Sequence, residues 1–561
     1  MTAAEQVAVF EGKFRVSLYK AFLSLHVMGA VKSGTLNLEH SYKYRSLDDY
    51  LISRERWAKE RNLLLERAGL TAFAEPRTIL ADLDARLFEQ YQVTNQNLHA
   101  NVNEFASVRA DGSLRLQTPT KHDDQDPPIM PRLFPEKHYI ALSEVLATVD
   151  RYSGFLDGFQ HWKQRHNRPR PAKKIFIAGI AALGCDIGTG KILRISREIN
   201  AAELENTVNW YFYPEGLHEV NDALLRFMDR LELPQIYRRI QNQLHTSSDG
   251  QKFEVRADSL NANYSFKYFG KGKGVSIYGF IDERNLLFHS TVISAAERES
   301  AYVIDGLMHN DVIKSDIHST DTHGYTEAIF GVMHLLGFSY APRIKNLKRQ
   351  KIHIFKSRND VDKTEWAVQP SSHIDVELIE GNWDDVLRFV ATIRLKEATA
   401  SDVFRRLNSY SKQHALYRSL KAFGKILKSI FILRYIDDVG LRQAIEGQLN
   451  KIESSHQFSR AISVGNGREM AQAEKYEQEV VEACKRLVKN AIVCWNYLYL
   501  TQMITEAPDK ETRAALLESV AAGSAVAWHY INLLGEYDFS DEKLQDSVGI
   551  QPPKSLALSS S

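Results

Sequence analysis

Apolar positions change their spacing twice along the chain. Up to about residue 110 they recur at helical spacing, and "YLISRERWAKERNLLLERAGL" (50–70) predicts a charged amphipathic helix. From about residue 245 apolar and polar residues alternate, as in "SSDGQKFEVRA" (247–257), which is typical of a half-buried strand. Beyond about residue 380 helical spacing returns in two long segments, 399–436 and 475–504. Strands are therefore predicted in one central stretch, between helical regions.

This central stretch predicts a sheet with helices packed on it. "GVSIYGFID" (274–282) and "LLFHSTVIS" (286–294) flank the short turn "ERN", which is the pattern of a β-hairpin. "DVIKSDIHST" (311–320) predicts a further strand, and "SYAPRI" (339–344) predicts a last, short one. Helical spacing precedes each of these two segments. The predicted fold class is α+β, with a mixed sheet in a predominantly helical chain.

Two positions in the same stretch carry signals of a helix start. Ser294 and Glu297 have the spacing of a capping box, which predicts a helix directly after them. Asp321 lies between two threonines, where the strand predicted at 311–320 ends and a run at helical spacing begins. Such an aspartate either caps the helix or, at the carboxyl end of a strand, holds a ligand or metal. Taken alone, this stretch favours capping.

Composition indicates an ordinary globular protein of several domains. The 561 residues are too many for one hydrophobic core, and 44% are hydrophobic and 25% charged. The charges of the 71 basic and 70 acidic residues nearly cancel, so the net charge does not indicate whether the protein binds nucleic acid. Three well-separated cysteines, the lack of a signal-peptide pattern and the shortness of the most apolar run, "AIVCWNYLYL", predict a cytoplasmic protein with no membrane partner.

The candidate chemistry lies in the carboxylates. Asp249 is in the first predicted strand, and Asp321 ends the fourth. In a sheet of the ribonuclease H type these two strands are central neighbours, so their aspartates would face each other. A carboxylate pair can hold two divalent ions about 3.5–4 Å apart, which stabilise the attacking and leaving oxygens of phosphoryl transfer. Oxygen ligands suit Mg²⁺, and a third carboxylate normally comes from a later helix.

Several segments, taken in order along the chain, resemble the catalytic region of Tn-three-family transposases. They are "SSDGQKFEV", "DSLNANYSFKYFG", "STDTHGYTEAIFGVMHLLGFSYAPRI" and "GKILKSIFILRYIDDVGLRQAI", and the likeness extends over about residues 30 to 535. The resemblance implies a DDE recombinase with a ribonuclease H-like core that a helical insertion interrupts. Members usually carry several hundred further residues upstream, with modules that bind the terminal inverted repeats. We expect those modules to be absent here.

The resemblance also implies the site residues. Asp249 and Asp321 would be the two catalytic, metal-binding aspartates, with two Mg²⁺ or Mn²⁺ ions. The family has a glutamate in an "LNxGE"-like helical segment, and "LNKIE" supplies Glu453 here, with Ile452 where glycine is usual. Glu469, in "NGREM", is the alternative third carboxylate. A solvated helix glutamate is the non-catalytic interpretation of Glu453.

The activity implied is replicative transposition. Metal-activated water would cut at each transposon end and expose a 3′ hydroxyl, which would then attack target DNA. The implied partners are double-stranded DNA, as transposon ends and target, and a second copy in a homodimer, in the bacterial cytoplasm near the nucleoid. Two alternatives stay open: a truncated, non-catalytic DNA-binding or regulatory remnant, and a stand-alone metal-dependent nuclease.

Basic clusters fit this interpretation. "PRIKNLKRQKIHIFK" (342–356) has six Lys/Arg residues and no acid, and three lysines farther on share one helical face. A basic loop at 161–174 has the same character. A single cluster usually forms a solvated face, but beside a phosphoryl-transfer site we expect contacts to DNA phosphates. The predicted DNA-binding residues are Arg343, Lys345, Lys348, Arg349, Lys351, Lys421, Lys425 and Lys428.

These patterns divide the chain into seven predicted regions. A helical scaffold at 1–115 is followed by a Pro-rich linker at 116–137 and a helical region with the basic loop at 138–243. The remaining regions are the first part of the ribonuclease H-like core (244–345), a mainly helical insertion (346–440), the catalytic helix with C-terminal helices (441–540) and a tail (541–561).

Overall fold

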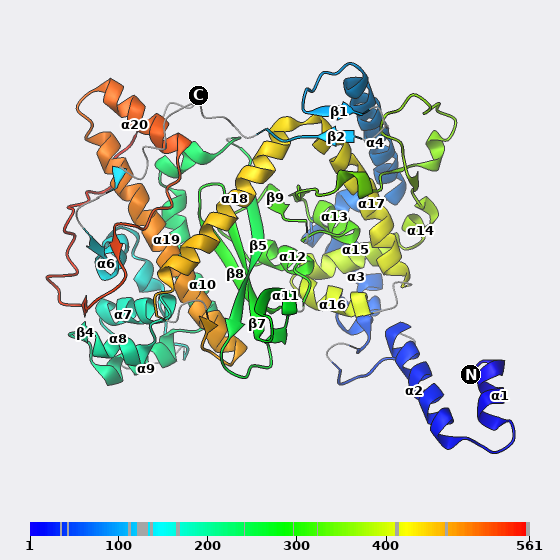
Figure 1. Ribbon diagram of the computed structural model, residues 1–561, viewed down its shortest axis with the longest axis horizontal. Helices are drawn as coiled ribbons and strands as arrows, with labels where there is room; N and C mark the ends of the chain where they lie inside the picture. Colours follow the sequence, from blue (N-terminus) through cyan, green and yellow to red (C-terminus); the bar gives the residue numbers. More distant parts are fainter. Residues whose placement is uncertain are drawn as a thin grey trace. The chain divides into compact units, whose positions relative to one another are not determined.

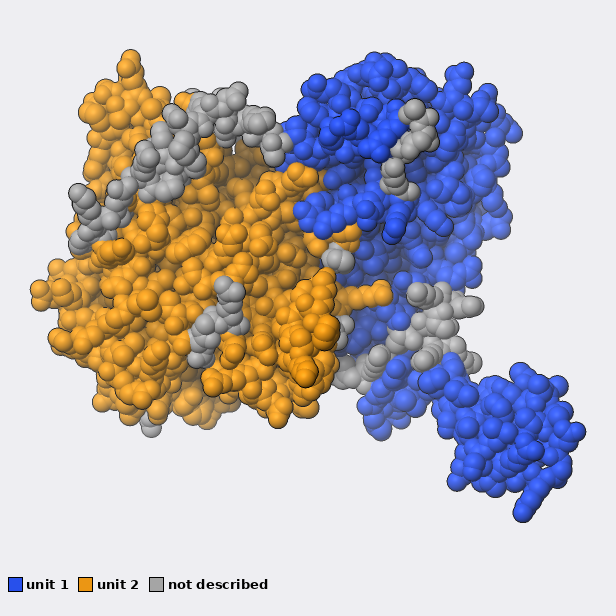
Figure 2. All heavy atoms as spheres, in the orientation of Figure 1, with its two compact units in different colours: residues 1–119, 300–308, 325–443 blue, residues 120–299, 309–324, 444–561 orange. Residues whose placement is uncertain are grey.

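The computed structural model is drawn in Figure 1. It describes residues 1–33, 36–41, 44–109, 114–119, 133–134, 139–163, 169–240, 242–295, 297–322, 324–409, 414–465 and 469–556. The chain forms two compact units (Figure 2): unit 1 is residues 1–119, 300–308 and 325–443, and unit 2 is residues 120–299, 309–324 and 444–561. Neither unit is continuous in sequence. Most of the predicted linker at 116–137, and residues 164–168 of the basic loop, lie outside the described residues.

Unit 1 is built mainly from helices, as the spacing at both of its ends predicts. Helices α13 and α17 form its closest pair, because Gly331 and Gly424 let the two backbones approach. A Cβ at Gly424 would collide with the Glu327 carbonyl oxygen. The elements are α1 (Ala3–Phe10), α2 (Val16–Ser33), α3 (Arg54–Arg67), α4 (Pro76–His99), β1 (Ala106–Val108), β2 (Leu114–Leu116), α12 (Ser300–Met308), α13 (Glu327–Leu335), β10 (Ser339–Tyr340), β11 (His353–Ile354), β12 (Ser372–His373), α14 (Val376–Gly381), α15 (Trp383–Arg394), α16 (Ala400–Ser409) and α17 (Ala415–Asp437).

Unit 2 contains the predicted sheet. Strands β9 (Ile317–Thr320), β5 (His245–Val255), β7 (Lys273–Asp282) and β6 (Asn263–Tyr264) lie in this order, with β8 (Leu287–Ser294) also beside β7 and β13 (Glu469–Met470) beside β5. β5 runs parallel to β9 and antiparallel to β7, so the sheet is mixed. The predicted hairpin is confirmed, since β7 and β8 pair antiparallel around residues 283–286.

Helices of unit 2 cover the sheet and extend away from it. The long helix α19 (Lys475–Thr505) is buried on all sides from Val480 to Leu498 and packs on β8, α10 and α7. Asn490 fixes it to β8, because its amide donates to the Leu287 carbonyl and accepts from the Leu287 N–H. The other elements are β3 (Ile140–Ala141), α6 (Leu142–Ser153), α7 (Lys173–Gly184), α8 (Thr189–Arg194), β4 (Ser196–Arg197), α9 (Ala201–Tyr211), α10 (Pro214–Asp229), α11 (Phe266–Phe269), α18 (Val439–Ile462, which begins in unit 1), α20 (Lys510–Ala522), β14 (Ile531–Asn532) and β15 (Tyr537–Asp538).

The predicted α+β class is confirmed, whereas two local signals were interpreted wrongly. The helix after Ser294 begins only at Ser300, because Ser294 is the last residue of β8. Asp321 does not cap α13, since the Thr326 side chain accepts the capping hydrogen bond from the Ile329 N–H. Among the described helices, none combines the length and the apolar character needed to cross a membrane.

Candidate metal centre

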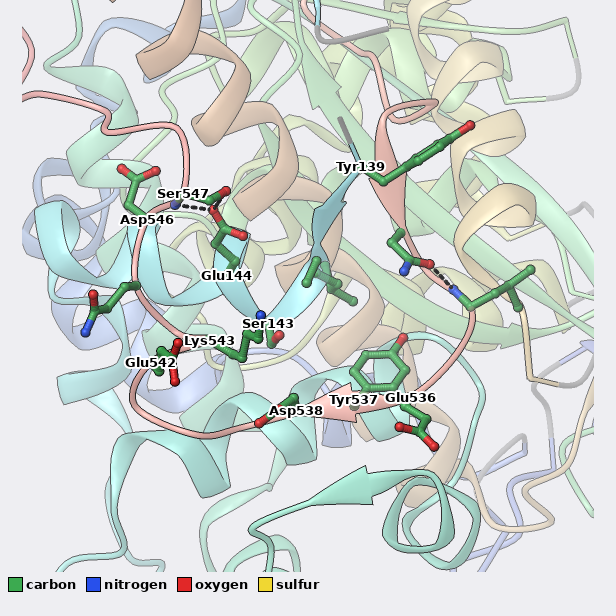
Figure 3. A pocket seen from close by; sticks show the side chains of 15 residues that line it. Tyr139, Ser143, Glu144, Glu536, Tyr537, Asp538, Glu542, Lys543, Asp546 and Ser547 are labelled. Atoms are coloured by element: carbon green, nitrogen blue, oxygen red, sulfur yellow. Dashed lines mark hydrogen bonds between the residues drawn. The ribbon is translucent and has the colours of Figure 1, made fainter. Parts of the chain in front are cut away.

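Two groups of acidic side chains in unit 2 differ in the partners of their carboxylates. The larger group lines a pocket of about 510 Å³ (Figure 3), where five of the lining residues are acidic: Glu144, Glu536, Asp538, Glu542 and Asp546. Its best-buried carboxylates already have donors, because Asp546 accepts from the N–H groups of Val548, Gly549 and Ile550 and Glu144 accepts from the Ser547 N–H. These acids shape the loop that carries them. The second group has a different geometry.

The second group begins with two neighbouring strands. β5 and β9 pair in parallel up to Ser248 and Thr320, so that the next residues along the two strands are Asp249 and Asp321. The expected adjacency of these strands is therefore confirmed. Asp321 receives a hydrogen bond on Oδ1 from the Gly324 N–H, 3.2 Å away, which holds it in the turn after β9.

Helix α18 crosses one face of β5. The Ser247 hydroxyl donates to the Gln448 carbonyl over 3.1 Å, and the Gln251 amide donates to the His456 carbonyl over 3.2 Å. Successive residues of a strand point to opposite faces, so Asp249, between these two, also points toward α18. The helix is thus fixed over the aspartate on both sides.

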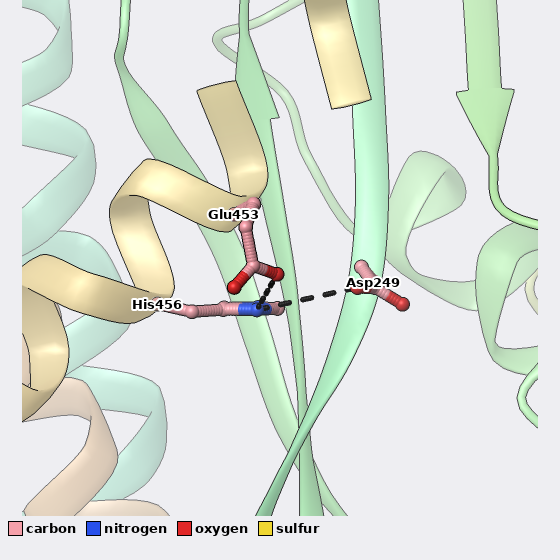
Figure 4. A group of neighbouring side chains, drawn as sticks. All are labelled: Asp249, Glu453 and His456. Carbon is pink, nitrogen blue, oxygen red and sulfur yellow. Dashed lines mark ion pairs between the residues drawn. The ribbon is translucent and has the colours of Figure 1, made fainter. Parts of the chain in front are cut away.

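Glu453 and His456 lie one turn apart on this helix and face Asp249 (Figure 4). The His456 Nδ1 atom is 3.5 Å from Glu453 Oε2 and 4.0 Å from Asp249 Oδ2. One ligand atom from each of the three residues lies within 4.8 Å of the others. Arg460, 3.8 Å from the other Glu453 oxygen, borders the group.

Burial and charge both favour a cation at this place. Burial raises the pKa of Asp249 to about 6; the charge of Asp321 acts in the same direction, whereas His456 opposes it. His456 chiefly lowers the pKa of Glu453, which is more exposed. A carboxylate whose ionised form is disfavoured by a neighbouring carboxylate is stabilised when a cation binds between them.

The residues present fit a divalent metal ion. Carboxylate oxygens are the ligands that Mg²⁺ and Mn²⁺ prefer, and β5 and α18 direct two of them to one place. The His456 Nδ1 faces the carboxylates, while its Nε2 is buried without a hydrogen-bond partner. An imidazole in this position can bind an ion or hold a ligating carboxylate in place.

Comparison with known proteins identifies the family. The family model described as the Tn3 transposase DDE domain matches residues 144–537. The chain belongs to this family. It is 30% identical over 534 residues to the transposase for transposon Tn1546 of Enterococcus faecium, covering 93% of this chain and 52% of that protein.

Two further relatives have the same coverage. The chain is 28% identical over 543 residues to the transposase for transposon Tn501 of Pseudomonas aeruginosa, covering 93% of this chain and 52% of that protein. It is 26% identical over 543 residues to the transposase for transposon gamma-delta of Escherichia coli strain K12, covering 94% and 53%. The chain thus spans about half the length of these members of the Tn3 transposase DDE family, and the resemblance expected from the motifs is confirmed.

For the third carboxylate of this DDE domain, the two candidates lie in different places. Glu453 faces Asp249, whereas Glu469 lies on β13 and pairs with Glu254 of β5. Glu254 follows Asp249 by five positions, which is about 16 Å of extended strand. The structure brings Glu453, and not Glu469, into the group.

His456 is the member of the group that sequence reasoning missed. The signal was present, because "LNKIESSH" puts a histidine three positions after Glu453, and residues at this spacing share a helix face. Without the position of β5, however, nothing distinguished this face of α18 from its others.

The predicted DNA-binding residues all lie in unit 1. Lys421 is exposed and Lys428 is buried, and both approach the Glu327 carboxylate of α13, at 3.4 and 3.8 Å. Part of their charge is therefore balanced within the unit. Lys345, Arg349 and Lys351 are exposed, whereas Arg343 and Lys425 are half-buried, and the Lys348 side chain lies outside the described atoms. A role of these residues in DNA binding stays a prediction.

Proposed function

We propose that this chain is the catalytic part of a DNA transposase, which cuts DNA at transposon ends and joins them to target DNA. One observation carries the proposal: carboxylates of β5 and α18 face each other, and Asp321 directly follows β9, the parallel neighbour of β5, in a chain of the Tn3 transposase DDE family. In this proposal Asp249, Asp321 and Glu453 bind two Mg²⁺ or Mn²⁺ ions. The core is then of the ribonuclease H type, and double-stranded DNA is the substrate of a homodimer.

The protein's own residues would supply position and charge. Bound divalent ions lower the pKa of the attacking water or hydroxyl and neutralise charge on the phosphate. Asp249 and Asp321 come from hydrogen-bonded strands, so their separation is held by the sheet. Glu453 depends on the position of α18, which the Ser247 and Gln251 hydrogen bonds fix. His456 orients Glu453, since its Nδ1 lies 3.5 Å from the carboxylate.

The test is cleavage of labelled DNA that carries the cognate transposon ends, with Mg²⁺ or Mn²⁺. The expected products are a nick that leaves a 3′ hydroxyl at each end and, with target DNA present, joined molecules. Asp249→Asn is the matched control, because it keeps the side-chain volume and removes one charge. Equal cleavage by this variant, or cleavage without divalent ions, would contradict the proposal. Nicking without joining would indicate a nuclease.

A further inference from the structure

Three aromatic side chains are exposed in the segment that joins β5 to β7 in unit 2. The exposed fractions are 66% for Tyr264, 87% for Phe266 and 48% for Tyr268. Single exposed aromatics are common on protein surfaces, but three exposed rings within five residues need an explanation. None of the three takes part in the metal centre.

The backbone under this patch is firmly attached to the sheet. β6 pairs with β7, with Tyr264 opposite Lys273, and the Asn263 amide donates to the Ser294 hydroxyl over 2.6 Å. Ala262 is buried in the same apolar cluster as Phe253 and Val275. Tyr264 is thus presented on a fixed base, which lowers the entropy cost of binding a partner.

Lysines lie beside the rings in the sequence. The segment "SFKYFGKGK" (265–273) has three lysines and no acid. The ammonium group of Lys273 is 5.1 Å from the centre of the Tyr264 ring, and that of Lys267 is 4.8 Å from the centre of the Tyr268 ring. Lys273 is also 3.7 Å from the exposed Asp258 carboxylate, so part of its charge is balanced. The aromatic–lysine patch is defined as Tyr264, Phe266, Lys267, Tyr268, Lys271 and Lys273.

We propose that the aromatic–lysine patch binds an unpaired DNA strand. Aromatic rings can stack on the bases of such a strand, and ammonium groups in the same segment can contact its phosphates. In a duplex the base faces are already stacked on each other, so only unpaired bases can stack on these rings. The inference rests on the proposed function for its substrate, which is DNA.

The patch is also connected to the catalytic strand. Lys252 follows Asp249 by three positions on β5, about 10 Å of strand, and its ammonium group is 5.6 Å from the centre of the Tyr268 ring. Lys252 points to the face opposite Asp249 and pairs with Glu299 at 2.6 Å. A strand held on the patch would therefore lie near β5, on the face opposite Asp249.

The test compares the affinity of the whole chain for two probes at one salt concentration: a single-stranded oligo(dT) and a blunt duplex of equal length. Phe266→Ala and Tyr268→Ala are each expected to weaken binding of oligo(dT) by about five-fold to a hundred-fold, with duplex binding changed less than about two-fold. Phe266→Trp should keep the affinity, because it keeps a stacking face. Tyr139→Ala is the matched control, since Tyr139 is 67% exposed elsewhere in unit 2.

Binding is measured without divalent ions, so the result does not depend on whether the protein cleaves DNA. Unchanged affinity of Phe266→Ala for oligo(dT) would overturn the inference even if cleavage occurs as proposed. Equal weakening for both probes would also overturn it, because the patch would then not select unpaired bases. A change in oligomeric mass without a change in oligo(dT) affinity would identify the patch as a protein contact and overturn it as well.

Discussion

The two acidic groups of unit 2 differ in what their carboxylates contact. The pocket of Figure 3 has more acids, yet its buried carboxylates accept hydrogen bonds from the backbone of the loop at 546–550 or from Ser547. In the metal centre, Asp249 and Glu453 are instead directed at each other across His456 (Figure 4). A carboxylate that has N–H donors stabilises a loop, whereas facing carboxylates are stabilised when a cation binds between them. The number of acids is therefore a poorer guide to a metal site than their partners.

The largest expected effect comes from the aspartates of the strands. Asp249→Asn or Asp321→Asn should lower the rate of DNA cleavage roughly a thousand-fold or more, because metal ligation supplies several kcal/mol of transition-state stabilisation. Folding should be preserved, since the side-chain volume is kept. Single-turnover cleavage assays and circular dichroism measure the two quantities. Asp538→Asn, in the acidic pocket, is the matched control and should cleave at the wild-type rate. Wild-type cleavage by either strand variant would remove the basis for the metal centre.

The second prediction distinguishes the two glutamates. Glu453→Gln should be as damaging as the aspartate changes, because the amide cannot supply the negative charge. Glu469→Gln should be nearly silent, since Glu469 is exposed on β13 and pairs with Glu254. The same cleavage assay measures both. The reverse result would assign the third carboxylate to Glu469 and would mean that the observed position of α18 is not the active one.

Local spacing predicted several elements of unit 2. Period-two alternation gave β5 and the hairpin of β7 and β8, and helical spacing gave α19 almost residue by residue. The adjacency of Asp249 and Asp321 followed from the expected strand order. These features depend on residues close together in sequence or on the strand order of a known type of sheet. They can therefore be predicted from the sequence pattern alone.

The features that were missed depend on contacts between distant residues. Ser294 had a capping-box partner in Glu297, but pairing with Val275 of β7 extends β8 through Ser294 and delays the helix to Ser300. His456 is recognised as part of the group only through its contact with Asp249 of β5, about two hundred residues earlier in the sequence. The burial of Lys428 is likewise set by α13, whose Glu327 lies opposite. Tertiary contacts override local signals at each of these positions.

The third prediction concerns His456. His456→Ala should lower cleavage about ten-fold to a hundred-fold, which is the usual cost of losing a group that orients a ligating carboxylate. A purely structural role would not change the metal requirement, so the decisive measurement is the Mn²⁺ concentration that gives half-maximal cleavage. This concentration should rise in His456→Ala. An unchanged value, with lower activity, would mean that the histidine does not act through the metal.

A fourth prediction tests metal binding without DNA. Saturating Mn²⁺ should raise the Tm of the wild-type protein by a few degrees, because ligand at about 100 times its Kd adds about 2.7 kcal/mol to the stability of the folded state. The increase should be lost in Asp249→Asn and kept in Asp538→Asn. Differential scanning calorimetry measures both. A shift that disappears in Asp538→Asn would place the cation in the pocket of Figure 3 and reverse the comparison.

The smallest effect is expected from the pocket itself. Asp546→Ala removes the acceptor of three backbone N–H groups, those of Val548, Gly549 and Ile550. Each N–H that is left without a partner and without water costs about 1–3 kcal/mol, and because this segment is only partly buried we expect a total loss of the same size. Urea unfolding should report this loss, while cleavage and the Mn²⁺-induced rise in Tm stay unchanged. Glu542→Ala is the control, because Glu542 is exposed in the same pocket and its removal should alter stability by less than about 0.5 kcal/mol. If Asp546→Ala instead abolished the Mn²⁺ effect, carboxylates with N–H donors would also bind the cation, and the distinction between the two acidic groups would fail.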